Sequence, residues 1–293
     1  MDTQLPAIFY SLVTLFSWGF ENALSKKYSR RLSPSKLVIY RNIVTVFITM
    51  SALLVFWKQT NFVFPYILLG FFIAIIAYIG YYFFLKGLET GNLAIVSPIS
   101  SSRILIATLV GLTFLKDTIK PIQIFFIVIV FFGVALSSFN FRSIRDSGFF
   151  DKKSGIPFAL LNALIWGIVV PFYSLPSAVL GAFLFSAILE TTGLVSSLIQ
   201  TNSTNKAIIL TKTEFKDNGL GLFIIGLSGG LGSIFLNLGY STGHIGIVSA
   251  ISSAVPLVAV TYGKFIYKEK LTTAQYSAIA LMITGIICLT YFR

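Results

Sequence analysis

The sequence has few charged residues, one cysteine and one histidine. Asp, Glu, Lys and Arg make up 11% of the 293 residues, compared with about 25% in ordinary soluble domains. Cys288 has no second cysteine with which to form an intramolecular disulfide, and His244 is the single histidine. The chain therefore has no Cys/His cluster for a metal site. It also has no G-x-x-x-x-G-K-[ST] loop, which excludes an ATP-driven pump. We expect neither a metal nor a cofactor.

What the chain has instead is long apolar runs. Its mean hydropathy is +0.87, and a membrane-spanning helix needs about 20 apolar residues. Uncharged stretches cover 59–85, 121–141, 154–189, 218–263 and 271–292. The formal net charge of +12 comes mostly from short loops beside these stretches, which favours contact with a membrane surface over nucleic acid. The sequence predicts an integral, multi-pass membrane protein whose surroundings are the lipid bilayer.

The apolar runs predict an all-α protein with ten transmembrane helices. Lipid offers no partners for backbone N–H and C=O groups, so the runs must be helical, and a barrel would show short alternating segments instead. Pro176 is expected to separate the sixth helix from the seventh. Ser33-Pro34 is typical of a helix start, and Thr272 with Gln275 of a capping box. The expected helices are 5–24, 36–56, 64–85, 92–114, 121–140, 155–174, 177–199, 219–241, 245–263 and 273–292.

The sequence contains an internal duplication. Residues 83–133 reappear at 235–285 with an offset of 152, and 17 of the 51 aligned residues are identical. Upstream, Trp18-Gly19 matches Trp166-Gly167 at an offset of 148. The chain therefore divides into two five-helix repeats, 1–150 and 151–293, that meet near 151–155. The clearest matching block is Gly87, Thr90, Gly91, Ile95, Val96, Ser97, Ile99, Ser100 and Ser101 with Gly239, Thr242, Gly243, Ile247, Val248, Ser249, Ile251, Ser252 and Ser253.

Because each repeat has an odd number of helices, the second repeat enters the membrane from the opposite side. Two inverted five-helix repeats are the architecture of secondary transporters, in which two halves rock about a site near the middle of the membrane. Loop charges bear on the orientation. The side that holds the N-terminus carries 4 basic loop or terminal residues and the other side carries 16. The positive-inside rule places the richer side in the cytoplasm and both termini outside.

Several motifs carry a resemblance to a known family. They are the two Trp-Gly pairs, Gly239-x-x-x-Gly243-x-x-Gly246 followed by Ser249 and Pro256, and Glu269-Lys270-Leu271-Thr272 before the last helix. The first half repeats part of this pattern as Gly87-x-x-x-Gly91, Ser97 and Lys116-Asp117. With the five-plus-five organisation, the whole chain resembles the EamA type of the drug/metabolite transporter superfamily. It departs at Ile104, which aligns with Pro256 and has Arg103 beside it.

The resemblance implies a ten-helix carrier with a central cavity lined by helices 1, 3, 4, 6, 8 and 9. It also implies a location in the inner membrane of a prokaryotic cell and two cytoplasmic termini. The last implication opposes the loop charges, so the orientation stays open.

Ionisable residues inside spans are costly and therefore informative. Arg103 lies in the middle of the fourth helix, and is either a clamp for a substrate carboxylate or half of a buried ion pair. Glu190, in the middle of the seventh, is either a proton or cation site or the other half of such a pair. Glu21 lines the cavity or pairs with Lys26 or Arg41. Arg41 is expected to reach the membrane surface with its long side chain.

Polar and aromatic groups complete the predicted site. Trp18 and Trp166 occupy matching positions, and the serine clusters of both halves serve either helix packing or substrate contact. The Gly87/Gly91 and Gly239/Gly243 pairs, with Gly226-x-x-x-Gly230, indicate close helix crossings or hinges. The predicted substrate-binding residues are Trp18, Glu21, Asn22, Tyr78, Tyr81, Tyr82, Ser100, Arg103, Trp166, Asn237 and Ser252, and the predicted proton-coupling residues are Glu21 and Glu190.

One motif indicates an enzyme. Gly226-Leu-Ser228-Gly-Gly230 matches the G-x-S-x-G pattern of serine hydrolases, in which a base must lie near the serine. His244 follows Ser228 by 16 residues, which is about 24 Å along one helix. That separation argues against a hydrolase and leaves the chain without a catalytic residue.

The sequence as a whole predicts a secondary transporter. It would move a small, amino-acid-like organic metabolite by alternating access, with proton coupling as a further hypothesis. We expect a monomer with no nucleic-acid partner. The alternatives are a nucleotide-sugar carrier of the same superfamily, an intramembrane serine hydrolase and a membrane scaffold that transports nothing.

Overall fold

The computed structural model describes residues 4–28, 31–90, 93–137, 154–203, 209–266, 268 and 271–292, and in these ranges every regular element is a helix. The first half contains α1 (Gln4–Tyr28), α2 (Pro34–Val55), the short 3-10 helix η1 (Trp57–Gln59), α3 (Phe64–Thr90), α4 (Leu93–Ser101), α5 (Arg103–Thr113) and α6 (Pro121–Leu136). The second half contains α8 (Ile156–Val169), the 3-10 helix η3 (Val170–Tyr173), α9 (Ser174–Leu180), α10 (Ala182–Ser203), α11 (Lys212–Ser241), α12 (Ile245–Ser253), α13 (Pro256–Ile266) and α14 (Thr273–Tyr291).

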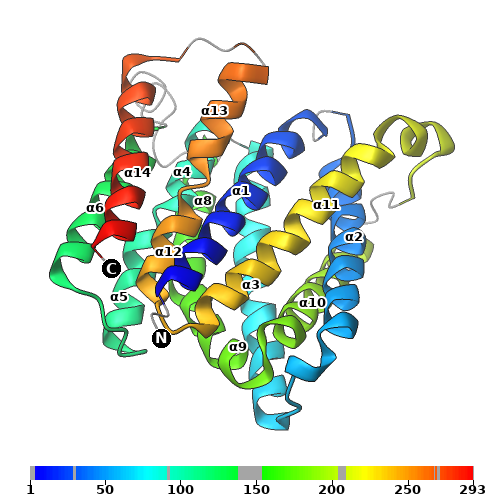
Figure 1. The fold of residues 1–293 in the computed structure, drawn as a ribbon. Helices are drawn as coiled ribbons and strands as arrows, with labels where there is room; N and C mark the ends of the chain where they lie inside the picture. The colour runs from blue at the N-terminus through cyan, green and yellow to red at the C-terminus, as the bar shows by residue number, and fades with distance from the viewer. Residues whose placement is uncertain are drawn as a thin grey trace.

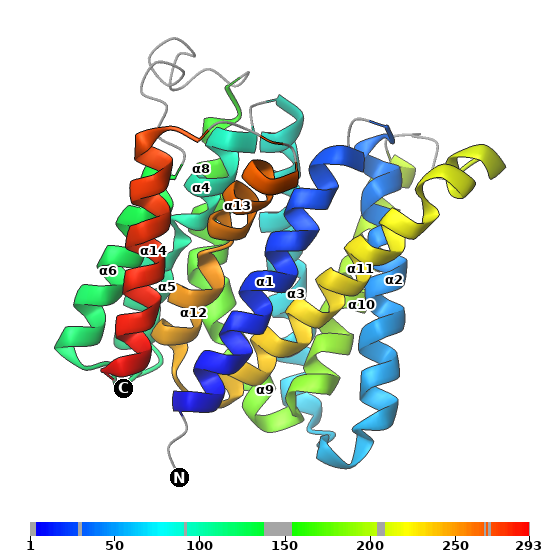
Figure 2. The same cartoon turned by 45° about the horizontal axis from the view of Figure 1, so that its top comes forward.

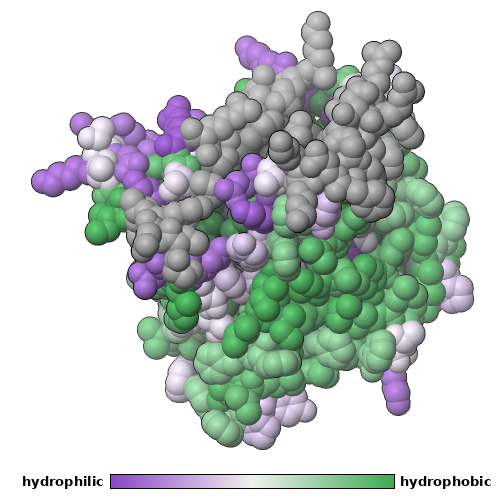
Figure 3. Space-filling model, turned by 180° about the vertical axis from the view of Figure 1, so that it is seen from behind, coloured by the Kyte–Doolittle hydropathy of each residue, from purple (hydrophilic) through white to green (hydrophobic). Residues whose placement is uncertain are grey.

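The protein is an integral, multi-pass membrane protein. Within the described residues, eight helical segments are long and apolar enough to cross a bilayer, and α6 is a shorter apolar helix of 16 residues. Figure 3 shows an apolar face below a hydrophilic end, as expected for a helical bundle whose sides contact lipid. The eight spans are Ser35–Val55, Phe64–Thr90, Val96–Thr113, Ile156–Leu180, Ala182–Asn202, Lys212–Ser241, Ile245–Ile266 and Thr273–Tyr291.

The predicted helix starts at Ser33 and Thr272 are confirmed. Ser33 has an extended backbone and its hydroxyl accepts a hydrogen bond from the Lys36 N–H, with proline at the first helical position. Thr272 and Gln275 form a reciprocal capping box at the start of α14. Each cap satisfies a backbone N–H that a helix start leaves without an intrahelical partner.

The predicted helix break at Pro176 is wrong, because the chain turns five residues later. Pro176 lies in the first turn of α9, where the missing N–H costs no intrahelical hydrogen bond. The turn is at Gly181, whose φ of +87° is accessible to glycine. A Cβ there would lie 2.4 Å from the carbonyl oxygen of Gln59, so the position also requires the absence of a side chain.

Two spans that were expected to be continuous are broken near their centres. The first is broken at Ser102, between α4 and α5, and the second at Ala254 and Val255, between α12 and α13. Ser102 and Ala254 are separated by the repeat offset of 152. Pro256 opens α13 only in the second half, so the break itself does not depend on that proline.

The two halves are interleaved. Across the boundary between them, α1 packs on α11 and α3 on α8, while α2 packs on both α10 and α11. The α6–α14 pair stands at one side of the molecule (Figure 1). Exchanging each helix for its counterpart in the other half reproduces the main pairs, since α1–α11 becomes α8–α3 and α6–α14 maps onto itself. In Figure 2 the described residues nearest both chain ends lie at the same end of the bundle.

Close helix contacts repeat between the halves. A Cβ on Gly133 of α6 would lie 2.7 Å from Met282 of α14, and a Cβ on Gly285 of α14 would lie 2.6 Å from Val130 of α6. These two contacts exchange under the offset of 152. Lys116 and its counterpart Lys268 share the same left-handed φ of 53°. The predicted hinge glycine Gly91 lies outside the described residues, as does most of the predicted boundary at 151–155.

Candidate substrate cavity

Two tryptophans line the site, and each packs on a glycine of the opposite half. Trp166 of α8 covers Gly80 of α3, where a Cβ would lie 2.4 Å from the indole, and its Nε1 donates to the Ala77 carbonyl at 2.9 Å. Trp18 of α1 covers Gly232 of α11 at the same 2.4 Å. The small residues therefore let the helices approach until the indoles lie between them.

The glycine that follows each tryptophan allows a second helix to pack closely beside it. A Cβ on Gly19 would lie 2.3 Å from Val258 of α13, and a Cβ on Gly167 would lie 2.6 Å from Ile106 of α5. Ile106 and Val258 are also separated by 152 residues. Each Trp-Gly pair thus allows the first helix of its half to pack closely on two helices at once, which fixes the direction of the indole.

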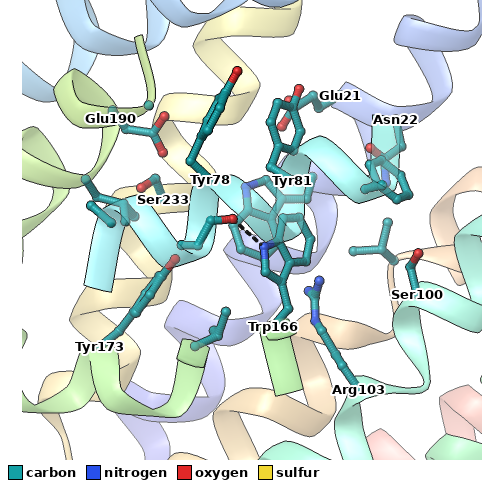
Figure 4. A pocket seen from close by; sticks show the side chains of 18 of the residues that line it. Glu21, Asn22, Tyr78, Tyr81, Ser100, Arg103, Trp166, Tyr173, Glu190 and Ser233 are labelled. Carbon is teal, nitrogen blue, oxygen red and sulfur yellow. Dashed lines mark hydrogen bonds between the residues drawn. The ribbon is translucent and has the colours of Figure 1, made fainter. Parts of the chain in front are cut away.

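A cavity opens between these packed helices. It measures about 1040 Å³ when its solvent-filled mouth is included. Figure 4 shows Trp166 near its centre, with Arg103 and Tyr173 toward one end and Glu21 and Asn22 toward the other. The lining residues are Trp18, Glu21, Asn22, Arg41, Asn42, Ala74, Ala77, Tyr78, Tyr81, Phe84, Ser97, Ser100, Ser101, Arg103, Trp166, Val170, Tyr173, Leu189, Glu190, Gly193, Ser233 and Val255.

A charged cluster of three helices forms one part of the wall. Arg41 of α2 donates from Nε to Glu21 of α1 at 2.8 Å and from Nη1 to Glu190 of α10 at 3.1 Å. The side chains of all three are between 11% and 12% exposed. Arg41 also donates to the Oδ1 of Asn42 at 2.9 Å. The cluster holds two carboxylates and one guanidinium, so its formal charge is −1 when all three groups are ionised.

Arg103 is the second cation of the cavity. It opens α5 directly after the break at Ser102 and is 8% exposed. Its guanidinium lies 4.7 Å from the ring centroid of Trp166 and 5.8 Å from that of Trp18. Within the described part of the chain it has no ion-pair or hydrogen-bond partner. A buried charge without a carboxylate partner is available to a ligand.

Two hydroxyls facing the cavity also have no hydrogen-bond partner among the described residues. They are Ser100 of α4 and Ser233 of α11, and both are buried. Ser100 precedes Ser101, which also lines the cavity, and Ser233 follows Gly232, on which Trp18 packs. Buried hydroxyls are normally paired, so both are available to hydrogen-bond a bound molecule.

The structure brings together most, but not all, of the predicted site residues. Tyr82 faces a second, smaller pocket between α2, α3 and α10, which shares Tyr78 with the main cavity. Asn237 is fully buried and donates to Ser186 between α11 and α10. Ser252 is buried within α12. The predicted residues that line the main cavity are Trp18, Glu21, Asn22, Tyr78, Tyr81, Ser100, Arg103, Trp166 and Glu190.

Sequence reasoning missed Arg41 as a cavity residue. The expectation that it reaches the membrane surface is wrong, because it lies between Glu21 and Glu190. A signal was present, since two carboxylates deep within spans require a nearby cation. Of the partners considered for Glu21, the structure shows Arg41. The pairing of Glu190 with Arg103 does not occur. Tyr173 and Ser233 carried no signal in the sequence.

The serine-hydrolase pattern is explained by packing. A Cβ on Gly226 would lie 2.5 Å from Val44, and a Cβ on Gly230 would lie 3.0 Å from Ile48, where α11 crosses α2. The hydroxyl of Thr45 donates to the Gly226 carbonyl at 3.0 Å across the same crossing. The described residues contain no group of three or more metal-ligating side chains.

A buried carboxylate closes the molecule at the end that carries both chain ends. Asp117, in the loop before α6, accepts from the Gly246 N–H at the start of α12 at 2.7 Å. Its own N–H donates to the Gly111 carbonyl at 2.9 Å, which ends α5. Burial raises the pKa of Asp117 above its ordinary value, against the opposing effect of the Gly246 N–H and the nearby His244. This contact links the two halves below the cavity.

Comparison with known proteins places this architecture in a family. The model of the EamA-like transporter family matches the chain twice, over residues 5–139 and 153–291. The chain belongs to the EamA-like transporter family. The two matches follow the two halves found in the sequence. Members of this family are transporters rather than enzymes, which identifies this EamA-like chain as a membrane transporter with a small-molecule substrate.

The fold of this EamA-like transporter is also found among solved structures. One of them, described only as "Crystal structure of protein", has a TM-score of 0.80 and 14% sequence identity, and the match covers 98% of this chain and 99% of that chain. At that identity the likeness concerns the fold alone. No curated protein sequence matches the chain.

Proposed function

We propose that this EamA-like chain is a secondary transporter that binds a small organic metabolite in the central cavity. The observation that carries the proposal is the convergence of charged and aromatic side chains from both halves on one cavity. Arg103 and the cluster of Glu21, Arg41 and Glu190 line its wall. The indoles of Trp18 and Trp166 line it as well, one from each half of the molecule. A site at the interface of two repeats is where secondary transporters bind their substrates.

The charges favour a zwitterionic, amino-acid-like substrate. Arg103 offers an unpaired guanidinium for a carboxylate, while the cluster around Arg41 has a formal charge of −1 that favours an ammonium group. The aromatic wall suits an apolar side chain. A nucleotide sugar brings two phosphate charges, whereas Arg103 is the single cavity cation without a carboxylate partner in the described ranges. The cavity therefore favours one negative group over two.

We infer ten crossings and an inverted relation of the halves. Support comes from the exchange of helix pairs between halves and from the shared end of the two chain ends. The breaks at Ser102 and Ala254 divide one span of each half into two helical segments beside the cavity. Discontinuous helices at the substrate site are typical of transporters that work by alternating access. The test uses single cysteines in a Cys288→Ser background. Gln59→Cys and Thr118→Cys should be labelled from one side of the membrane, and Ser35→Cys and Asn202→Cys from the other. Labelling of all four from one side contradicts the arrangement.

Transport is tested with the purified protein in sealed liposomes. Uptake of radiolabelled amino acids should exceed that of empty liposomes, and Arg103→Gln should reduce it at least tenfold, because a charged hydrogen bond to carboxylate contributes about 1.5–3 kcal/mol. Lys58→Gln is the matched control, since Lys58 is an exposed cation in η1 away from the cavity. Normal uptake by Arg103→Gln, or no uptake of any tested metabolite by the wild type, contradicts the proposal.

We propose further that Glu21 or Glu190 couples transport to protons. The two carboxylates share one arginine, so that protonation of either leaves a balanced pair with the other. An imposed pH gradient should therefore change the uptake rate of the wild type. The double variant Glu21→Gln/Glu190→Gln should lose this response. If the uptake rate is the same with a pH gradient imposed in either direction as without one, the protein is a facilitated carrier and this proposal is wrong.

A further inference from the structure

The indoles of Trp18 and Trp166 hold a cation that belongs to the protein itself. The guanidinium of Arg103 lies 4.7 Å from one ring centroid and 5.8 Å from the other, within the range in which a cation is attracted to an aromatic face. Trp18 and Trp166 come from α1 and α8, at matching positions of the two halves, and the close glycine contacts of Gly80 and Gly232 fix both rings.

The repeat supplies the two rings but not the cation. Arg103 aligns with Val255, which lines the same cavity from the other half. A molecule with valine at both positions would keep the two indole faces and leave the space between them open. In this chain the guanidinium of Arg103 lies against both rings, 4.7 and 5.8 Å from their centroids, and it has neither a carboxylate nor a hydrogen-bond partner among the described residues.

The rest of the cavity attracts cations. The cluster of Glu21, Arg41 and Glu190 has a formal charge of −1, and the wall also carries Tyr78 and Tyr81. Aromatic rings beside a negative cluster are the features that bind quaternary ammonium ligands in proteins. Without the charge of Arg103 the cavity therefore has the composition of an organic-cation site.

We propose that Arg103 is a specificity-determining residue that excludes organic cations by occupying an aromatic cage formed by Trp18 and Trp166. The guanidinium fills the cage and repels a second cation, and at the same time it offers its N–H groups to an anionic group of the substrate. This inference rests on the proposed function, because it takes the cavity to be the substrate site. It adds that one side chain sets the sign of the charge that the cavity accepts.

The experiment measures binding of choline to the purified protein by equilibrium dialysis and tryptophan fluorescence. The neutral isostere 3,3-dimethylbutan-1-ol serves as the comparison ligand, because it has the same shape without the charge. Arg103→Val should bind choline roughly tenfold or more tightly than the wild type, as expected for a desolvated cation on two indoles. Its affinity for the neutral isostere should change far less. Lys58→Gln is the control, because it removes an exposed cation in η1 away from the cavity, and it should leave choline binding at the wild-type level.

A second pair of variants tests the cage itself. In the Arg103→Val background, Trp166→Leu or Trp18→Leu should remove the gain in choline binding. Arg103→Met replaces Arg103→Val if the latter does not fold, since the longer side chain preserves more of the packing. A folded Arg103→Val or Arg103→Met that binds choline no better than the wild type overturns the proposal. So does a gain that survives the loss of either indole.

The outcome is distinguishable from failure of the proposed function. Choline binding is measured in detergent and needs no transport, so it reports on the cage even if the wild type moves no metabolite. If the wild type takes up amino acids but the variants gain no choline binding, the proposed transport function is supported and the proposed role of Arg103 in the aromatic cage is wrong. If the variants gain choline binding but the wild type takes up none of the tested metabolites, the proposed role of Arg103 is supported and the proposed transport function is wrong.

Discussion

The two halves of the molecule share their packing and differ in their charges. Each half has a tryptophan over a glycine of the other half, at an identical distance of 2.4 Å. Each also has a lysine with a φ of 53° after the same helix. By contrast, the offset of 148 takes Glu21 and Arg41 of the first half to Val169 and Leu189 of the second, and the offset of 152 takes Arg103 to Val255.

This difference separates two kinds of constraint on the sequence. The glycines and tryptophans are held by close helix approach, where one added carbon collides with a neighbour, and both halves must satisfy it. The charged groups are under no such steric constraint, and in the proposed function they contact a substrate, which need not be symmetric. Glu190 is the one cavity carboxylate of the second half in the described residues. The repeat positions that break the symmetry with a charge therefore coincide with the cavity in which we propose that the substrate binds.

The largest effect is expected at the charged difference between the halves. Arg41→Met leaves Glu21 and Glu190 buried and unpaired, and should lower the free energy of unfolding by about 3–5 kcal/mol. The counterpart change, Leu189→Met, conserves volume and should cost less than about 1.5 kcal/mol. Unfolding in detergent micelles measures both. Adding Glu21→Gln and Glu190→Gln should restore much of the loss, and equal costs for the two single variants would contradict the asymmetry.

A smaller effect should be equal in both halves. Gly80→Ala and Gly232→Ala each place a Cβ 2.4 Å from an indole, and each should cost about 1–3 kcal/mol through overpacking. Gly219→Ala, also in α11, is the control, because its Cβ would meet no atom closer than 3.7 Å. That change should be neutral or stabilising, since alanine favours a helix over glycine. Thermal unfolding of the three variants tests the equivalence, which fails if the two indole sites differ clearly.

Asp117 tests the contact between the halves at the end with both chain ends. Asp117→Ala removes the acceptor of the Gly246 N–H and should cost about 1–3 kcal/mol. Asp117→Asn keeps an acceptor and should cost less. Thermal unfolding compares the two variants. Equal losses of stability would show that the hydrogen bond to the Gly246 N–H does not account for the contribution of Asp117. The counterpart, Glu269, lies outside the described residues.

The pH dependence of stability has a definite sign at Asp117. Burial raises the pKa of this carboxyl in the folded protein, so the folded state holds the proton more tightly than the unfolded state. The stability that this tighter proton binding contributes is fully present below the ordinary pKa of about 3.9. It is lost as the pH rises through the raised pKa of the folded protein. Melting temperatures measured across this window should fall less in Asp117→Asn than in the wild type.

The smallest effect is expected for two matching hydrogen bonds. The Thr14 hydroxyl shares its one proton between the Tyr10 carbonyl at 3.0 Å and the Gly232 carbonyl at 3.3 Å, and Asn162, its counterpart, donates to the Gly80 carbonyl at 2.8 Å. Thr14→Val and Asn162→Leu should each cost about 0.6 kcal/mol, the average for hydrogen bonds between membrane helices, and at most about 1.7 kcal/mol. The shorter bond of Asn162 should show the larger loss. The reverse order in unfolding measurements would contradict this view.

The sequence was informative about the fold because a bilayer restricts the choices. Apolar runs in lipid must be helices, and the starts at Ser33 and Thr272 follow from local hydrogen bonding. The breaks were harder to predict. The sequence pattern predicts a helix end at Pro176, yet Pro176 lies in the first turn of α9. Gly181 ends that helix, and the contact that requires a glycine there is with Gln59, which is distant in sequence. The turn at Ser102 itself contains no proline, although Pro98 lies inside α4 one turn before it.

The candidate site was predictable where a residue type is rare in its surroundings. Glu21, Glu190 and Arg103 stand out because charges are costly in a span, and the repeat drew attention to Trp18 and Trp166. Residues placed by tertiary packing were not predictable. Asn237 and Ser252 have the chemistry of cavity residues but lie buried between helices.

The charges of the cavity also determine how the membrane voltage acts on it. The carboxylates of Glu21 and Glu190 and the guanidiniums of Arg41 and Arg103 cancel in formal charge. Moving one charge through 100 mV changes its free energy by about 2.3 kcal/mol. In an alternating-access cycle, an empty cavity of zero net charge reorients without electrical work, and so does a cavity that holds a zwitterion. A cargo with one net charge, or a coupled proton, instead moves with or against the voltage, so the electrical signature of the proposed transport reports the summed charge of cargo and protons.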